Sequence, residues 1–221
     1  MSEHGALMVT GASGTVGTVL LRAATSGWAG PVMAIGRRRP DAAVEHFVDA
    51  DLADPAATDR ACTTVAAVQP PVTGLVLAAG VDCRSTLAAL TEAELQRAFA
   101  VNCASALRLL TAAVSATDAT VLRAVVVSSD VVDQPQAGTL VYAATKAALD
   151  VAVQHASLDD SRLRVLLVRL PALGTPMIDV QDRRSAISRP PLPLLDEAAA
   201  AVADFLLGDK ATDPVRIWTD A

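Results

Sequence analysis

The stretch ALMVTGASGTVG, residues 6–17, decides how the fold is predicted. It joins a short apolar run, residues 6–10, to three glycines at three-residue spacing, and an apolar helix-forming segment follows to about residue 26. A strand, a glycine turn and a helix in this order let the backbone approach a pyrophosphate at the helix N-terminus. A glycine turn can also serve packing alone. Its position at the first strand favours cofactor binding over that alternative.

The same alternation of apolar run and helix continues along the chain. Further strands are expected at residues 31–35, 45–50, 74–80 with its glycine turn, 122–128, 163–170 and 215–218. Helices are expected at residues 54–68, 91–117, 142–158 and 196–207, with an irregular, proline-bounded stretch over 175–193. Strands that are nearly continuous apolar runs are typical of a parallel sheet covered on both faces. The sequence therefore predicts one α/β domain over residues 1–221, a doubly wound parallel sheet of about seven strands.

Bulk composition excludes several classes of protein. A net charge of -6 and a pI near 5.0 argue against a nucleic-acid binder. The three cysteines have no metal-ligand or CxxC spacing, which is typical of reduced, buried thiols. The N-terminus has no positively charged lead-in, and no apolar run approaches the roughly 18 residues that span a membrane. We expect a cytoplasmic protein with no metal, nucleic-acid or membrane partner.

Two reactive side chains lie close together after the strand at 122–128. Tyr142 is the only tyrosine and Lys146 one of two lysines, and their spacing of four residues places them on one face of a helix. The ammonium is expected to lower the tyrosine pKa and make the phenol a proton donor and acceptor near neutral pH. Ser129 and Asn102 are expected to complete the group. For Asn102 taken alone, a structural hydrogen bond is the simpler explanation.

The cofactor contacts are predicted from the ends of the strands, where ligands bind in such sheets. The glycine loop contributes Gly11, Ser13, Gly14, Thr15, Val16 and Gly17. Arg37 and Arg38 follow the second strand and suit a ribose 2′-phosphate, hence NADPH, although a solvated basic turn is the alternative. Arg39 precedes a proline and is expected to point away.

The third and fourth strands end in two further candidate contacts. Asp51, followed by Leu52, is placed to accept from an adenine amino group or to cap the next helix. Ala79 and Gly80 are placed to let the cofactor pass close to the backbone.

Taken together, these motifs resemble the short-chain dehydrogenase/reductase family, from Thr10 to about Trp218, and the resemblance implies a Rossmann-type fold. Ser129 stands thirteen residues before Tyr142, as the family pattern has it. By this resemblance Tyr142 is the general acid, Lys146 lowers its pKa and holds the nicotinamide ribose, and Ser129 donates to the substrate oxygen. Asn102 would hold a water that links Lys146 to solvent. Pro171 and Thr175 correspond to the family segment near the nicotinamide.

Several residues depart from the family pattern. The departures are Thr15 in the glycine loop, Ala78 for asparagine, Ala172 for glycine after Pro171, and Asp130 directly after Ser129. The lid near 175–193 is short, and the substrate pocket is expected after strands four to six.

The resemblance implies an NADPH-dependent reductase of a small ketone or aldehyde. The alternatives are non-redox chemistry at the same tyrosine, such as dehydration or cyclisation, and an NADP-binding protein without catalysis. A homodimer or homotetramer through the helices near 91–117 and 142–158 is also expected.

Overall fold

The computed structural model describes residues 4–173, 193–208 and 215–217. Its strands are β1 (Ala6–Thr10), β2 (Val32–Gly36), β3 (His46–Asp49), β4 (Val72–Leu77), β5 (Leu122–Ser129), β6 (Leu163–Leu170) and β7 (Val215–Ile217). Its helices are α1 (Thr15–Thr25), α2 (Pro55–Ala67), α3 (Glu92–Phe99), α4 (Ser105–Ala116), α5 (Leu140–Asp159) and α7 (Pro193–Leu207). A π-helical turn, η1 (Ala100–Ala104), joins α3 to α4, and a 3-10 turn, η2 (Asp130–Val132), follows β5. The predicted lid near 175–193 and the predicted contact Thr175 lie outside the described residues.

The seven strands form one parallel sheet in the order β3-β2-β1-β4-β5-β6-β7. This confirms the predicted doubly wound α/β fold. The order turns back at β1, because the chain runs outward to β3 and then returns to place β4 on the other side of β1. Ligands of such sheets bind beyond the carboxyl ends of the strands at this switch point.

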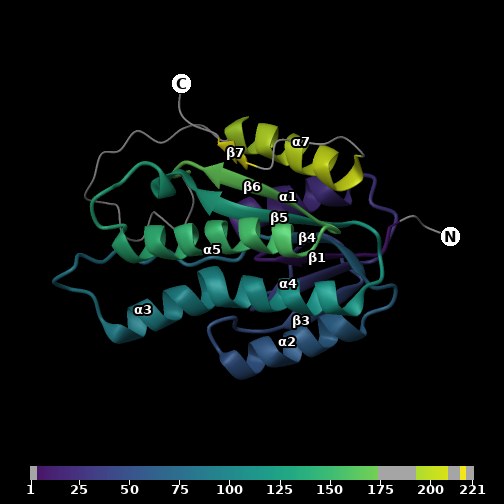
Figure 1. The fold of residues 1–221 in the computed structure, drawn as a ribbon, viewed down its shortest axis with the longest axis horizontal. Coiled ribbons are helices and arrows are strands. Elements are labelled where there is room, and N and C mark those ends of the chain that lie inside the picture. Colours follow the sequence, from purple (N-terminus) through teal and green to yellow (C-terminus); the bar gives the residue numbers. More distant parts are fainter. Residues whose placement is uncertain (1–3, 174–192, 209–214, 218–221) are drawn as a thin grey trace.

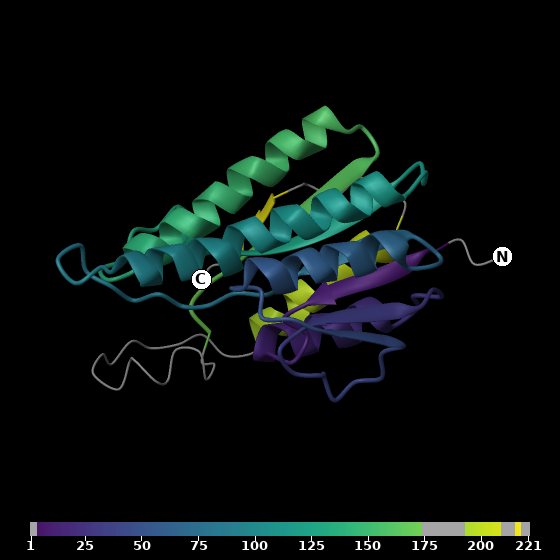
Figure 2. The same ribbon diagram turned by 90° about the horizontal axis from the view of Figure 1, so that it is seen from below.

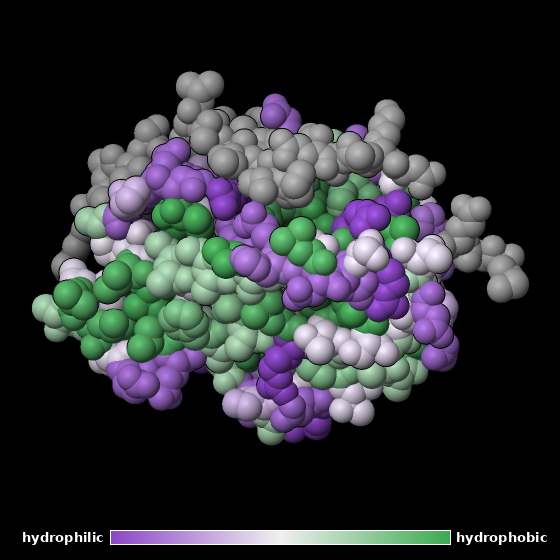
Figure 3. All heavy atoms as spheres, in the orientation of Figure 1, coloured by the Kyte–Doolittle hydropathy of each residue, from purple (hydrophilic) through white to green (hydrophobic). Residues whose placement is uncertain are grey.

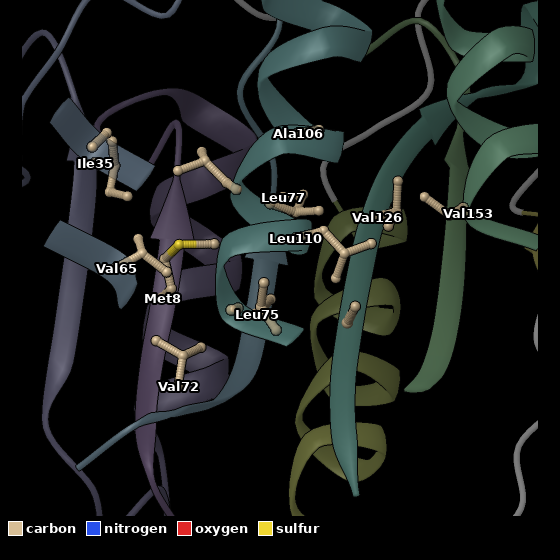
Figure 4. Packing of buried hydrophobic residues seen from close by; sticks show 14 of the residues in the cluster. Met8, Ile35, Val65, Val72, Leu75, Leu77, Ala106, Leu110, Val126 and Val153 are labelled. Atoms are coloured by element: carbon tan, nitrogen blue, oxygen red, sulfur yellow. The ribbon is translucent and has the colours of Figure 1, made fainter. Parts of the chain in front are cut away.

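Helices cover both faces of the sheet, with α2, α4 and α5 on one side and α1 and α7 on the other (Figures 1 and 2). Successive strand residues point to opposite faces, so strands β1 to β6 supply both cores. In β1, Met8 enters the core beneath α2, α4 and α5, where it lies near Leu75 (Figure 4), while Leu7 and Val9 enter the other. Burial on both faces explains why the strands are continuous apolar runs.

The helix predicted over residues 91–117 is interrupted, which corrects that prediction. Its start is as expected, because Thr91 and Glu94 form a reciprocal capping box. From Ala100 to Ala104, however, the helix takes a π turn, and the Ser105 N–H donates to the carbonyl of Ala100, five residues earlier. The π turn carries Asn102, whose side chain is bonded to the loop after β4.

Among the described residues, one helical stretch, Glu92–Ala116, is long and apolar enough by length and composition to cross a membrane. The core helix of a globular protein passes the same test, and the α4 part of this stretch packs on the sheet and beside α2.

Apolar residues also gather on the surface over the first turns of α5 and the loop before α3 (Figure 3), where Leu87 and Leu140 are exposed. The homo-oligomer stays a prediction, which a mass measurement by light scattering tests.

Candidate active site

The glycine loop is tight because two of its glycines lie against backbone. Gly11 has φ +67°, and a β-carbon there would lie 2.8 Å from the Ala78 carbonyl. A β-carbon on Gly17 would lie 2.1 Å from the carbonyl oxygen of Gly11. Only glycine fits at either position, so the turn brings β1, the start of α1 and the end of β4 together. The α1 N-cap, Gly14, has no side chain, which leaves the helix N-terminus open to the solvent side.

A cleft of about 900 Å³ opens beyond the carboxyl ends of the strands, beside this loop. It is lined by most of the residues predicted to bind the cofactor: Gly11, Ser13, Gly14, Thr15, Val16, Gly17, Arg37, Arg38, Asp51, Leu52, Ala79, Gly80 and Pro171. The same cleft is lined by Ser129, Tyr142 and Lys146. The predicted catalytic and cofactor-binding residues on this list therefore lie together at one edge of the sheet.

The three arginines after β2 have different environments. Arg37 and Arg38 are exposed and line the cleft. Arg39 turns to its own loop, where it donates to the Val44 carbonyl at 3.0 Å and lies 5.9 Å from the centre of the Phe47 ring. This agrees with the expectation that Arg39 points away.

Asp51 does not cap α2, which removes one of the two roles considered for it. Its Oδ1 accepts from the Ala53 N–H, while Asp54 is the N-cap and accepts from Ala56.

Thr10, directly before the glycine loop, links two strands. Its hydroxyl accepts from the N–H groups of both Ala78 and Ala79 at 3.1 Å. Sequence reasoning missed this role of Thr10, which ties the end of β1 to the end of β4.

Asn102 is fully buried and holds three protein groups rather than lining the cleft. Its Oδ1 accepts from the Val81 N–H at 2.8 Å, and its Nδ2 donates to the Val81 carbonyl and to the Thr145 hydroxyl, both at 3.0 Å. The side chain thus fixes the loop after β4 to α5. The predicted water next to Asn102 stays a prediction.

Lys146 is buried beneath the cleft and points to the sheet. Its Nζ donates to the Val127 carbonyl at 2.8 Å and lies 5.8 Å from the centre of the Tyr142 ring. Burial lowers the lysine pKa to about 8, against the opposing charge of Asp150. Gly80 lies beside it, since a β-carbon there would be 3.6 Å from Nζ.

The expectation that Lys146 lowers the tyrosine pKa is wrong in this structure. Burial, followed by the charge of Asp82, raises the pKa of Tyr142 to about 12. A hydrogen bond from Ser129 and the charge of Arg84 act in the opposite direction but are weaker. The lysine ammonium is hydrogen bonded to the Val127 carbonyl, and burial is the main cause of the raised tyrosine pKa.

Two carboxylates lie near the tyrosine for which the sequence predicted no role. Asp82 forms an ion pair with Arg84, Oδ2 to Nε 3.0 Å, and both line the cleft. Asp130 is buried and accepts from the Ser129 hydroxyl at 3.2 Å. For Asp130 the available signal was a charged side chain directly after a strand end, whereas Asp82 lies in the loop after β4.

Comparisons with known proteins agree with this geometry. A family model described as short chain dehydrogenase matches residues 6–185, and no curated protein matches. A short chain dehydrogenase family protein from Francisella tularensis subsp. tularensis SCHU S4 is 18% identical with a TM-score of 0.79, covering 97% of this chain and 96% of that one. A short-chain dehydrogenase from Streptomyces avermitilis is 24% identical, with a TM-score of 0.78 and coverage of 98% and 88%. A third, from Burkholderia cenocepacia J2315 in complex with NADP, is 26% identical, with a TM-score of 0.72 and coverage of 90% and 89%.

The chain belongs to the short-chain dehydrogenase/reductase family, because the family model spans most of its length. It is accordingly an NAD(P)-dependent oxidoreductase.

The packing of the glycine loop predicts a contrast between two glycines of this chain. Gly17→Ala should lower the free energy of unfolding by about 1–3 kcal/mol, because its methyl group overlaps the Gly11 carbonyl. Gly36→Ala is the matched control, since a β-carbon there meets nothing within 4 Å. Urea unfolding followed by circular dichroism measures both. Equal losses in the two variants would contradict this account of the loop.

The single tyrosine makes its ionisation directly measurable. In the folded protein, tyrosinate absorbance should appear only well above pH 10, with the pKa of Tyr142 at about 12, and Asp82→Asn should lower that pKa. The urea-unfolded chain, which lacks the buried environment, should titrate near the ordinary value of about 10. A folded protein that titrates at the unfolded value would show that burial does not control this phenol.

Proposed function

We propose that the protein is an NADPH-dependent reductase that transfers a hydride to the carbonyl carbon of a small ketone or aldehyde. One observation carries the proposal. Ser129, Tyr142 and Lys146 line the same cleft as the glycine loop and the exposed Arg37 and Arg38. Hydride transfer to a carbonyl requires acid–base groups next to a site that can hold a dinucleotide.

The residues present fit a dinucleotide. Gly11 and Gly17 allow the tight turn, and the exposed N-cap Gly14 has no side chain, so the N-terminus of α1 can offer N–H groups to a pyrophosphate. Arg37 and Arg38, exposed on the cleft rim, would take the 2′-phosphate, and neither makes a hydrogen bond or ion pair with another described residue. Asp51 and Leu52 would lie beside the adenine, and Gly80 and Pro171 along the remaining path.

Each side chain of the site has a separate task in the proposed reaction. When bound, the nicotinamide supplies the hydride. Tyr142 gives its proton to the substrate oxygen as the hydride reaches the carbonyl carbon, so that an alcohol forms. Ser129 donates a hydrogen bond to the same oxygen, where negative charge develops. Lys146 places a positive charge beneath the cleft, and Asn102 holds the loop and α5 at a fixed separation.

The raised pKa of Tyr142 keeps the phenol at neutral pH in the protonated form that carbonyl reduction uses. A phenol with a pKa of about 12 is fully protonated at pH 7, which is the form that a general acid needs. Alcohol oxidation needs the phenolate and should therefore speed up as the pH rises toward that value.

Turnover of Tyr142→Phe tests the reaction. The variant keeps the ring and loses the proton, so NADPH oxidation with a panel of aldehydes and ketones should fall to background while NADPH binding, followed by its fluorescence, is retained. Full activity in this variant would refute the proposal. Product formation by the wild-type protein without a change in NADPH absorbance would point to the non-redox alternative, and binding without any turnover to the non-catalytic one.

Cofactor preference tests the two arginines. Replacing both Arg37 and Arg38 with alanine should weaken NADPH binding by roughly 100-fold or more and NADH binding much less, because each charge-assisted hydrogen bond to phosphate contributes about 1.5–3 kcal/mol. Arg39→Ala is the control, since that side chain is engaged with Val44 and Phe47. Fluorescence titration with each nucleotide gives the ratio. An unchanged ratio in the double variant would remove the arginines from the 2′-phosphate site.

A further inference from the structure

Strands β5 and β6 each place a polar side chain in the otherwise apolar layer beneath α5. Ser128 and Arg169 are paired in register on the two strands. Val126 and Leu167, two residues earlier on each strand, belong to the core cluster on the α5 side. Because strand side chains alternate with a period of two, Ser128 and Arg169 face α5 as well.

Asp150 of α5 meets both of these polar side chains. It is 1% exposed, and its Oδ2 accepts from Arg169 Nε at 2.8 Å. Ser128 and Arg169 oppose the rise in the Asp150 pKa that burial causes, although Ser128 Oγ and Asp150 Oδ1 are both buried without a hydrogen-bond partner among the described residues. Arg169 continues to the surface, where its Nη1 donates to the half-exposed Asp133 at 2.5 Å.

The same carboxylate lies one helical turn from Lys146. Residues four apart on a helix are surface neighbours, so Asp150 and Lys146 share the face that packs on the sheet. The lysine is 3% exposed and bonded to the carbonyl of Val127, the residue before Ser128. Burial favours its neutral form, and the two groups that favour the charged form are Asp150 and, with a smaller effect, the Cys103 thiol.

We propose that Asp150 is a positioning residue for Lys146: anchored by Arg169, its negative charge one helical turn away keeps the buried lysine protonated beneath the cleft at neutral pH. Asp150 and Lys146 share no hydrogen bond or ion pair, so the carboxylate acts on the lysine through its charge, while Arg169 ties that carboxylate to Asp133 at the surface. If Asp150 served only as a hydrogen-bond partner of Arg169, replacing it would leave the pKa of Lys146 unchanged. The pKa of Lys146 is therefore the quantity to measure.

The sequence makes the measurement clean, because Lys210 is the only other lysine. In a Lys210→Arg background, the ¹³Cε signal of labelled lysine reports Lys146 alone. Asp150→Asn should lower the measured pKa of Lys146 by about one pH unit or more, since a neighbouring opposite charge shifts a pKa by 1–3 units. Asp150→Glu should return it close to the wild-type value, and Asp133→Asn, which leaves Asp150 in place, should change it little.

A second comparison covers the case in which Asp150→Asn fails to fold because Arg169 is left short of a buried partner. Arg169→Gln removes that charge, and Asp150→Asn is then added to it, so both buried groups are neutral. Lys146 should again lose its proton at lower pH in the double variant than in Arg169→Gln alone. A Lys146 pKa that stays the same across both comparisons would overturn the proposal.

Turnover gives a second readout that rests on the proposed function. If Lys146 must be charged, the pH at which kcat/KM falls on the alkaline side should move down in Asp150→Asn by the same amount as the lysine pKa, and Asp150→Glu should restore it. The lysine signal needs no substrate, so a failure of the reductase assay and a failure of this proposal are separate results.

Discussion

The close approach of β1 to the end of β4 is the constraint on which the rest of the structure depends. Gly11 lies directly against the backbone of Ala78, and the Thr10 hydroxyl binds the N–H groups of Ala78 and Ala79. This contact lies at the point where the strand order reverses, so it sets where the cleft opens. Gly17 then fixes the direction of α1, whose N-terminus faces that cleft.

The second half of the site is built around a buried charge. Lys146 enters an apolar layer between α5 and the sheet, and such a charge is costly unless it is paired. The Val127 carbonyl and the Asp150 carboxylate offset that cost from two sides. The polar positions Ser128 and Arg169 at the ends of β5 and β6 are therefore part of the same arrangement as the residues that line the cleft.

The fold and the cleft could be predicted because they follow from patterns with a fixed period. Continuous apolar strands imply burial on both faces, and the glycine spacing implies a tight turn at β1. The π turn at Asn102 could not be predicted, since the partner of its side chain, Val81, is distant in sequence. The pKa of Tyr142 was wrongly predicted for the same reason. It depends on Asp82 and on burial, while sequence spacing shows only Lys146.

Asn102 binds both the N–H and the carbonyl of Val81 through its amide. A neighbouring β-strand would offer the same donor and acceptor pair, so this side chain imitates one peptide unit of a strand. In effect it adds a further rung to the hydrogen-bond ladder beyond the point where β4 ends. The position of the loop that carries Gly80 past the cleft is therefore tied to the helical turn that bears the amide.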